Sequence, residues 1–154
     1  MCSALLRSPR RAEAAARSDE PSDAGAVIRL LVAEDTSILR ETLVTLFTLE
    51  DGIEVVAQVA AGTGIVPAAI EYRPDVALLD IGMPGADGLS AAVELARRLP
   101  DCKVVVLTAL ETPDNRRRAA AAGVSGFLLK GVPAAMLIDA VRSAARPAGS
   151  RRPG

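Results

Sequence analysis

The chain has 154 residues and a mass of 15.9 kDa, which suits one domain of ordinary size with tails and disfavours two full domains. Half of the residues are hydrophobic, but only two Phe and one Tyr are aromatic, which disfavours single-strand nucleic acid binding by base stacking. The net charge is -1 and there is no His, which excludes His-based triads and His-ligated metal sites.

The two ends differ in composition from the middle of the chain. Residues 1–26 are rich in Ala, Arg, Ser and Pro and are predicted to be a disordered leader, and residues 146–154 a disordered basic tail. Residues 27–145 carry eleven basic and fifteen acidic side chains, and this acidic body is a poor electrostatic partner for nucleic acid. No apolar run approaches the roughly 18 residues of a membrane span, and the two Cys lack metal or redox spacing. We therefore expect a cytoplasmic location.

Short β-branched runs alternate with longer Ala- and Leu-rich segments of helical spacing. The predicted strands are residues 27–33, 53–59, 76–80, 103–108 and 126–129. The predicted helices are residues 37–49, 65–72, 89–99, 114–122 and 133–145. Five such units predict a single α/β domain with a doubly wound, five-stranded parallel sheet and helices on both faces. The nearly continuous apolar first, third and fourth strands indicate a sheet that is covered on both sides.

Polar side chains stand where the predicted strands end. Glu34 and Asp35 follow the first strand, Asp80 ends the third, Thr108 ends the fourth, and Lys130 follows the fifth. In a parallel sheet these positions share one rim, where ligands bind. Clustered carboxylates repel one another unless a cation neutralises them, and Mg²⁺ is the hard divalent ion that such oxygen ligands suit.

This set of residue types is suited to phosphoryl transfer. The Asp80 carboxylate, lying between the metal and solvent, can attack phosphorus and form an acyl phosphate. The Lys130 ammonium can pair with one phosphoryl oxygen, and the Thr108 hydroxyl can donate a hydrogen bond to another. Together they would offset the charge of the transferred group, with no His of the chain's own.

These residues and the stretches around them closely resemble the receiver domain of two-component response regulators. The matching stretches are residues 31–35 (LVAED), 74–88 (PDVALLDIGMPGADG), 104–109 (VVVLTA) and 122–130 (AGVSGFLLK). The resemblance implies a flavodoxin-like fold with strand order 2-1-3-4-5. It is closest to the subfamily that usually carries a LuxR-type helix-turn-helix output domain. Residues 146–154 are too few for such a domain, so we expect no direct DNA binding by this chain.

The resemblance implies a role for each carboxylate. Asp80 would be the phosphoacceptor, phosphorylated by a sensor histidine kinase. Asp35, Asp80 and the backbone carbonyl of Gly82 would bind Mg²⁺, while Glu34, where most relatives have Asp, would act mainly through a bound water.

The resemblance also implies a conformational switch. Thr108 and Lys130 would contact the phosphoryl group, and the Thr108 hydroxyl would move toward it as the aromatic ring of Phe127 turns inward. The readout would be a changed face formed by the fourth helix, fifth strand and fifth helix. Any homodimer is expected to depend on phosphorylation.

Several positions depart from the usual receiver pattern or stand beside the predicted site. Gly82 and Leu110 flank the phosphoryl group in relatives, and because neither side chain can orient water, we expect slow dephosphorylation. Gly131 follows Lys130 where many relatives have Pro after a cis bond, so we expect a trans bond here. The three arginines at 116–118 are interpreted as a solvated helix face.

Two other functions remain open. One is a degenerate receiver that binds partners without phosphorylation. The other is a haloacid-dehalogenase-like phosphatase, which would use an Asp nucleophile in a similar fold. Such phosphatases carry a second Asp two residues after the nucleophile, where this chain has Gly82, so we expect no turnover enzyme.

Overall fold

The computed structural model describes residues 26–83 and 87–146. They contain one sheet of five parallel strands in the order β2-β1-β3-β4-β5, which confirms the predicted order. The strands are β1 (Ile28–Ala33), β2 (Ile53–Val59), β3 (Val76–Asp80), β4 (Lys103–Thr108) and β5 (Gly126–Leu129). Apart from Ala26 and Arg146, the predicted leader and tail lie outside the described residues, so both stay predictions.

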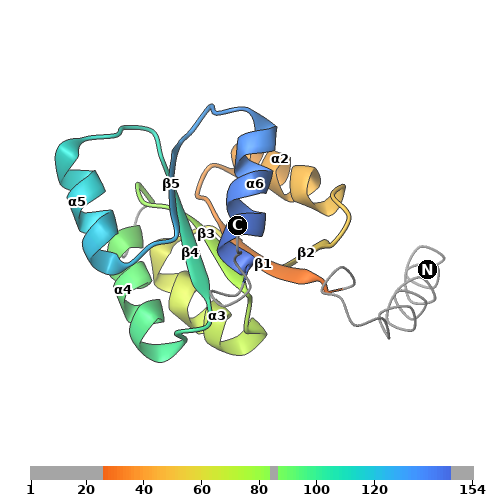
Figure 1. Ribbon diagram of the computed structural model, residues 1–154, viewed down its shortest axis with the longest axis horizontal. Coiled ribbons are helices and arrows are strands. Elements are labelled where there is room, and N and C mark those ends of the chain that lie inside the picture. Colours follow the sequence, from red (N-terminus) through yellow and green to blue (C-terminus); the bar gives the residue numbers. More distant parts are fainter. Residues whose placement is uncertain (1–25, 84–86, 147–154) are drawn as a thin grey trace, which may run out of the picture.

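Helices cover both faces of the sheet, with α2 and α6 on one side and α3, α4 and α5 on the other (Figure 1). Their bounds are α2 (Ser37–Thr48), α3 (Ile65–Tyr72), α4 (Gly88–Arg98), α5 (Pro113–Ala122) and α6 (Ala134–Ala145), and the one-turn 3₁₀ helix η2 (Gly62–Gly64) precedes α3. The sequence did not predict η2. Helix α3 has the predicted bounds, and the other four helices differ from their predicted bounds by one residue at one or both ends. In the described part of the chain, no helix is long and apolar enough to cross a membrane.

Two apolar cores lie on opposite sides of the sheet. Phe47 of α2 and Val141 of α6 belong to one core, and Ile65 of α3 and Leu95 of α4 belong to the other. All four side chains are 0% exposed. The residues of β1 and β3 alternate between the two cores, which confirms that these strands are covered on both faces.

The strand register brings the strand ends to one rim of the sheet. Ala33 at the end of β1 pairs with Leu79, one residue before Asp80. Asp80 itself pairs with Leu107 of β4. Thr108, which follows Leu107 in β4, pairs with Leu129 at the end of β5. The residues that follow β1 and β5 therefore start at the same level as Asp80 and Thr108.

Gly88 allows the start of α4 to lie against the end of β3. Asp87 caps this helix, because its Oδ1 accepts a hydrogen bond of 3.2 Å from the backbone N–H of Leu89. A Cβ atom at Gly88 would lie 2.8 Å from the Cα of Ile81 and 3.0 Å from the carbonyl oxygen of Asp80. The lack of a side chain at Gly88 thus sets the distance between α4 and the predicted site.

We expect Gly88→Ala to lower the free energy of unfolding by roughly 1 to 3 kcal/mol, because backbone atoms would have to shift. Ala is otherwise the better helix former by about 1 kcal/mol, so the close contact must reverse the usual sign. Urea unfolding measures the change. Ser90→Ala, at an exposed position of the same helix, is the control and should change stability by no more than about 0.5 kcal/mol. A stabilised Gly88→Ala protein would contradict the packing argument.

Candidate functional site

Lys130 forms ion pairs with two buried carboxylates. Its Nζ lies 3.0 Å from Oδ2 of Asp80, and 3.2 Å and 3.4 Å from Oε1 and Oε2 of Glu34. Glu34 is 0% exposed and Asp80 is 3% exposed, whereas the Lys130 side chain keeps 25% of its surface in solvent. A single ammonium is therefore shared by two carboxylates, which lie at the ends of β1 and β3.

Burial dominates the electrostatics of Glu34. The pKa of this carboxyl lies above its ordinary value, mainly because burial disfavours the charged form, and nearby Asp80 adds to the rise. A hydrogen bond from the backbone N–H of Thr36 and the contact with Lys130 oppose the shift. Burial alone would lower the pKa of Lys130, but its contacts with Asp80 and Glu34 raise it. Lys130 therefore stays charged at neutral pH.

The carboxylates of Glu34, Asp35 and Asp80 can converge on one cation. One oxygen of each lies within 4.8 Å of the others. Oε1 of Glu34 is buried and lies 3.2 Å from Nζ of Lys130, but it accepts no hydrogen bond, so a metal-bound water could still donate one to it. Asp35 is exposed, which leaves an open side toward solvent. This all-oxygen set fits a hard divalent ion such as Mg²⁺.

A cavity of about 330 Å³ opens above Asp80. Asp35, Thr108 and Lys130 are among the residues that line it, and with Asp80 and Gly82 they make five of the predicted site residues, with Glu34 directly behind them. Gly82 lines it too, and its backbone N–H donates a hydrogen bond of 2.9 Å to Oδ1 of Asp80. The role predicted for the Gly82 carbonyl stays a prediction.

The Thr108 hydroxyl is engaged by the loop that follows β4. It donates to the carbonyl oxygen of Leu110 over 2.9 Å and accepts from the backbone N–H of the same residue over 3.1 Å. The side-chain amide of Asn115, in α5, donates to the same carbonyl over 3.2 Å. The Thr108 hydroxyl and the Asn115 amide of α5 therefore donate to the same acceptor, the Leu110 carbonyl oxygen.

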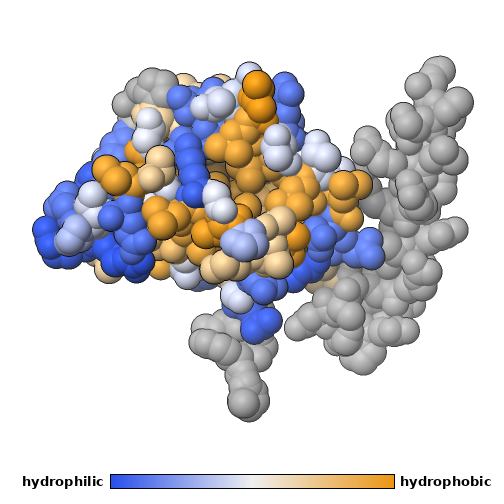
Figure 2. Space-filling view, turned by 90° about the horizontal axis from the view of Figure 1, so that it is seen from above, coloured by the Kyte–Doolittle hydropathy of each residue, from blue (hydrophilic) through white to orange (hydrophobic). Residues whose placement is uncertain are grey.

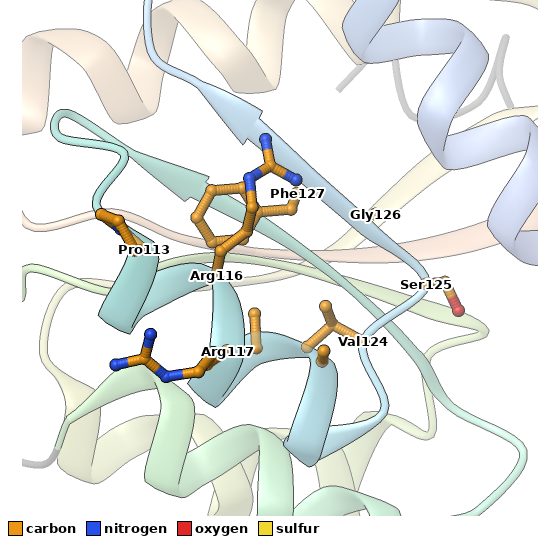
Figure 3. A pocket seen from close by; sticks show the side chains of 9 residues that line it. Pro113, Arg116, Arg117, Val124, Ser125, Gly126 and Phe127 are labelled. Atoms are coloured by element: carbon orange, nitrogen blue, oxygen red, sulfur yellow. The ribbon is translucent and has the colours of Figure 1, made fainter.

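Phe127 lies beneath an arginine on the outer side of α5 (Figure 3). The ring is partly buried, and the guanidinium carbon of Arg116 is 5.0 Å from its centre, a cation–π contact. Arg116 also pairs with Glu111. Together with α5 and the start of β5, these two side chains line a second cavity of about 600 Å³.

Three polar residues of the Asp80 cavity were not predicted from the sequence, namely Asp87, Asn115 and Arg118. All three arginines at 116–118 are exposed, which confirms the predicted solvated face. The prediction did not anticipate that Arg116 lies over Phe127 or that Arg118 pairs with Asp87 at the cavity. The three-residue spacing of Asn115 and Arg118 places them on one face of α5. The direction in which that face points depends on how α5 packs.

Gly131 explains why the usual Pro is absent after Lys130. Its φ is +97°, in the left-handed region that Pro cannot adopt and that other residues rarely adopt. The described residues contain no cis peptide bond, which confirms the trans bond expected here.

Comparison with known proteins shows the family to which the chain belongs. Residues 30–142 match the family model of the response regulator receiver domain. The chain belongs to this family. Two-component signalling and the flavodoxin-like fold expected from the resemblance are thereby confirmed, and receiver domains are in general not turnover enzymes.

The chain is similar to several response regulators. It is 41% identical to the transcriptional regulatory protein DesR of Bacillus subtilis over 76% of this chain and 58% of DesR. It is 37% identical to the response regulator GacA of Pseudomonas viridiflava over 75% of this chain and 54% of GacA. The receiver thus spans little more than half the length of these relatives.

Solved structures give the same assignment. The receiver domain of the response regulator NarL from Mycobacterium tuberculosis superposes with a TM-score of 0.75 at 30% identity, covering 78% of this chain and 97% of that one. A DNA-binding response regulator of the LuxR family from Staphylococcus aureus superposes with a TM-score of 0.74 at 28% identity, covering 78% of this chain and 100% of that one.

The raised pKa of Glu34 predicts a specific pH dependence. The folded protein keeps a proton on Glu34 above the ordinary pKa of 4.5, where the unfolded chain has released it, so this group contributes less stability as the pH rises through that window. Without divalent cations, the wild type should therefore lose stability relative to Glu34→Gln between about pH 4.5 and neutral pH.

Urea unfolding over this pH range in EDTA measures the difference. Glu71→Gln, an exposed position of α3, removes a carboxylate outside the cluster and should follow the wild type. If the free energy of unfolding of the wild type minus that of Glu34→Gln stays constant or increases as the pH rises, burial does not dominate the pKa of Glu34.

Proposed function

We propose that this receiver accepts a phosphoryl group on Asp80 from a sensor histidine kinase in the cytoplasm. The supporting observation is the contact of Lys130 with Asp80 at 3.0 Å, at the edge of a cavity that Thr108 and Asp35 also line. This contact places an ammonium beside a nearly buried carboxylate nucleophile. Phosphoryl transfer depends on such positive charge to stabilise the transferred group. Receiver domains of this family take their phosphoryl groups from histidine kinases.

The proposed reaction is a displacement at phosphorus. A carboxylate oxygen of Asp80 forms a bond to phosphorus while the phosphorus–nitrogen bond of the kinase phosphohistidine breaks, and the electron pair returns to the imidazole nitrogen. Lys130 can then shift its contact from the carboxylate to a phosphoryl oxygen. The Thr108 hydroxyl can donate to another phosphoryl oxygen if it leaves the Leu110 carbonyl.

Glu34, Asp35 and Asp80 are the residues that would hold Mg²⁺, with Glu34 acting through a water as the resemblance implies. When bound, the ion supplies positive charge that offsets the phosphoryl oxygens. The carbonyl of Gly82 would complete the protein's ligands.

The rearrangement of Thr108 would carry the signal outward through α5 and β5. When the hydroxyl turns to the phosphoryl group, the Leu110 carbonyl keeps the hydrogen bond from Asn115, so this acceptor is not left unpaired. Phe127 would then pack inward and leave Arg116. The face formed by α5, β5 and α6 would change in shape and charge, as a shift between two populated states.

The changed receiver would act through protein partners, including a second copy of the chain. Seen from above, hydrophobic residues occupy the middle of the surface and hydrophilic residues cover the side where α5 lies (Figure 2). Ile38 near the start of α2 is 75% exposed, and Met136 near the start of α6 is 48% exposed. These two exposed hydrophobic side chains favour a homodimer, which phosphorylation would regulate.

We expect no direct DNA binding by the acidic body.

Acetyl phosphate with Mg²⁺ should add one phosphoryl group to the protein, detected by intact mass. Asp80→Asn should remove the addition, and EDTA should prevent it. With Gly82 and Leu110 beside the site, the group should be lost slowly, over minutes or longer. Continuous release of inorganic phosphate would instead indicate the phosphatase, and an unmodified but folded protein would indicate a degenerate receiver.

Arg116→Ala should increase the inward population of Phe127 before phosphorylation. An exposed cation–π contact contributes about 0.5 to 1 kcal/mol, so its loss should change the ratio of the two states roughly 2- to 5-fold. NMR of the Phe127 ring, with Phe47 as the internal reference, measures this ratio. Arg117→Ala, the neighbouring position, is the matched control. Identical Phe127 spectra in the two variants would contradict the proposed role of Arg116.

A further inference from the structure

Arg118 is a second cation at the Asp80 cavity, from an element that does not contribute Lys130. It lies on α5 and lines the cavity together with Asp80 and Lys130. Its guanidinium pairs with Asp87, the residue that caps α4, and 46% of its side chain is exposed. Arg118 therefore stands at the mouth of the cavity, while Lys130 occupies the inner end.

The charges around the cavity favour a second cation for an incoming phosphate. Asp35, Asp80 and Asp87 line it and Glu34 lies behind. Among the described residues, the cations that line it are Lys130 and Arg118, so the four carboxylates leave a formal charge of -2. Lys130 is already shared by two of these carboxylates. A Mg²⁺ ion held by Glu34, Asp35 and Asp80 would bring this sum to zero, so a dianionic phosphoryl group would still meet no net positive charge at the cavity.

Arg118 can leave Asp87 without leaving a carboxylate unpaired. Oδ1 of Asp87 keeps its hydrogen bond from the backbone N–H of Leu89, and the side chain is 35% exposed, so water can replace the guanidinium. A guanidinium also matches phosphoryl oxygens with two parallel hydrogen bonds, which an ammonium cannot do.

We propose that Arg118 exchanges its contact with Asp87 for one with the phosphoryl group, first on the donor and then on Asp80. This inference rests on the proposed phosphorylation of Asp80. With acetyl phosphate, an Asp80 oxygen bonds to phosphorus while the bond from phosphorus to the acetate oxygen breaks, and acetate leaves with the electron pair. Arg118 stays protonated throughout and only stabilises charge. Asp87 competes with the phosphoryl group for Arg118.

The competition predicts opposite effects for the two partners. The second-order rate constant for phosphorylation by acetyl phosphate, followed by intact mass in Mg²⁺, should fall roughly 3- to 10-fold in Arg118→Ala, the loss expected for one partly exposed charged hydrogen bond. Asp87→Asn should raise the rate constant, because Asn still caps α4 but holds Arg118 less tightly. Arg118→Lys should fall between Ala and the wild type.

Arg117→Ala is the matched control, since Arg117 is one residue away, pairs with Asp114 and does not line this cavity. It should stay within about 2-fold of the wild type. If Arg118→Ala and Asp87→Asn both lower the rate constant, the pair is only a structural clamp between α4 and α5, and the inference is wrong. It is equally wrong if Arg118→Ala matches Arg117→Ala.

Two observations separate this inference from the proposed function. If the wild type accepts a phosphoryl group that Asp80→Asn cannot, but Arg118 has no effect, only the inference fails. If the wild type accepts none, the proposed function fails first. Circular dichroism and urea unfolding of each variant exclude misfolding, and Asp87→Asn still tests the competition should Arg118→Ala be unstable.

Discussion

The site at the rim of this receiver depends on one ammonium that pairs with two carboxylates of very low solvent exposure. Lys130 lies 3.0 Å from Asp80 and 3.2 Å from Glu34, and both acids are almost fully buried. A buried carboxylate without a partner is costly enough to shift toward its neutral form. The strand register makes this pairing, because it brings the ends of β1, β3 and β5 to one level.

Around this centre, α5 connects the Asp80 cavity with the outer surface. Asn115 shares the Leu110 carbonyl with the Thr108 hydroxyl, and Arg118 lines the cavity. On the outer side of the same helix, Arg116 covers Phe127. A displacement of α5 would therefore alter contacts at the site and at the surface together, which gives the proposed switch a physical route through one rigid element.

Much of this arrangement could be predicted from the sequence because local signals agreed. Apolar runs separated by helical segments gave the parallel sheet, and a parallel sheet brings all carboxyl ends to one edge. Glu34, Asp35, Asp80, Thr108 and Lys130 could therefore be grouped from their positions after the strands. Arg118 and Asp87 could not, because their pairing depends on how closely α4 and α5 approach, and no periodicity encodes that distance.

The sequence by itself determined the strand order through the family resemblance, the chemistry available at the rim, and the absence of imidazole. It also suggested that the bond after Lys130 is trans, although the reason, a glycine at φ +97°, appeared only in the structure. The tertiary structure alone decided that Lys130 is shared by two acids, that the Thr108 hydroxyl is held by the Leu110 carbonyl, and that three neighbouring arginines have three different environments. The ion pairs of Lys130 and Arg118 join residues distant in the chain, whereas the other contacts are local. The free energies of all of them depend on burial and distance, which the packing of the helices against the sheet sets.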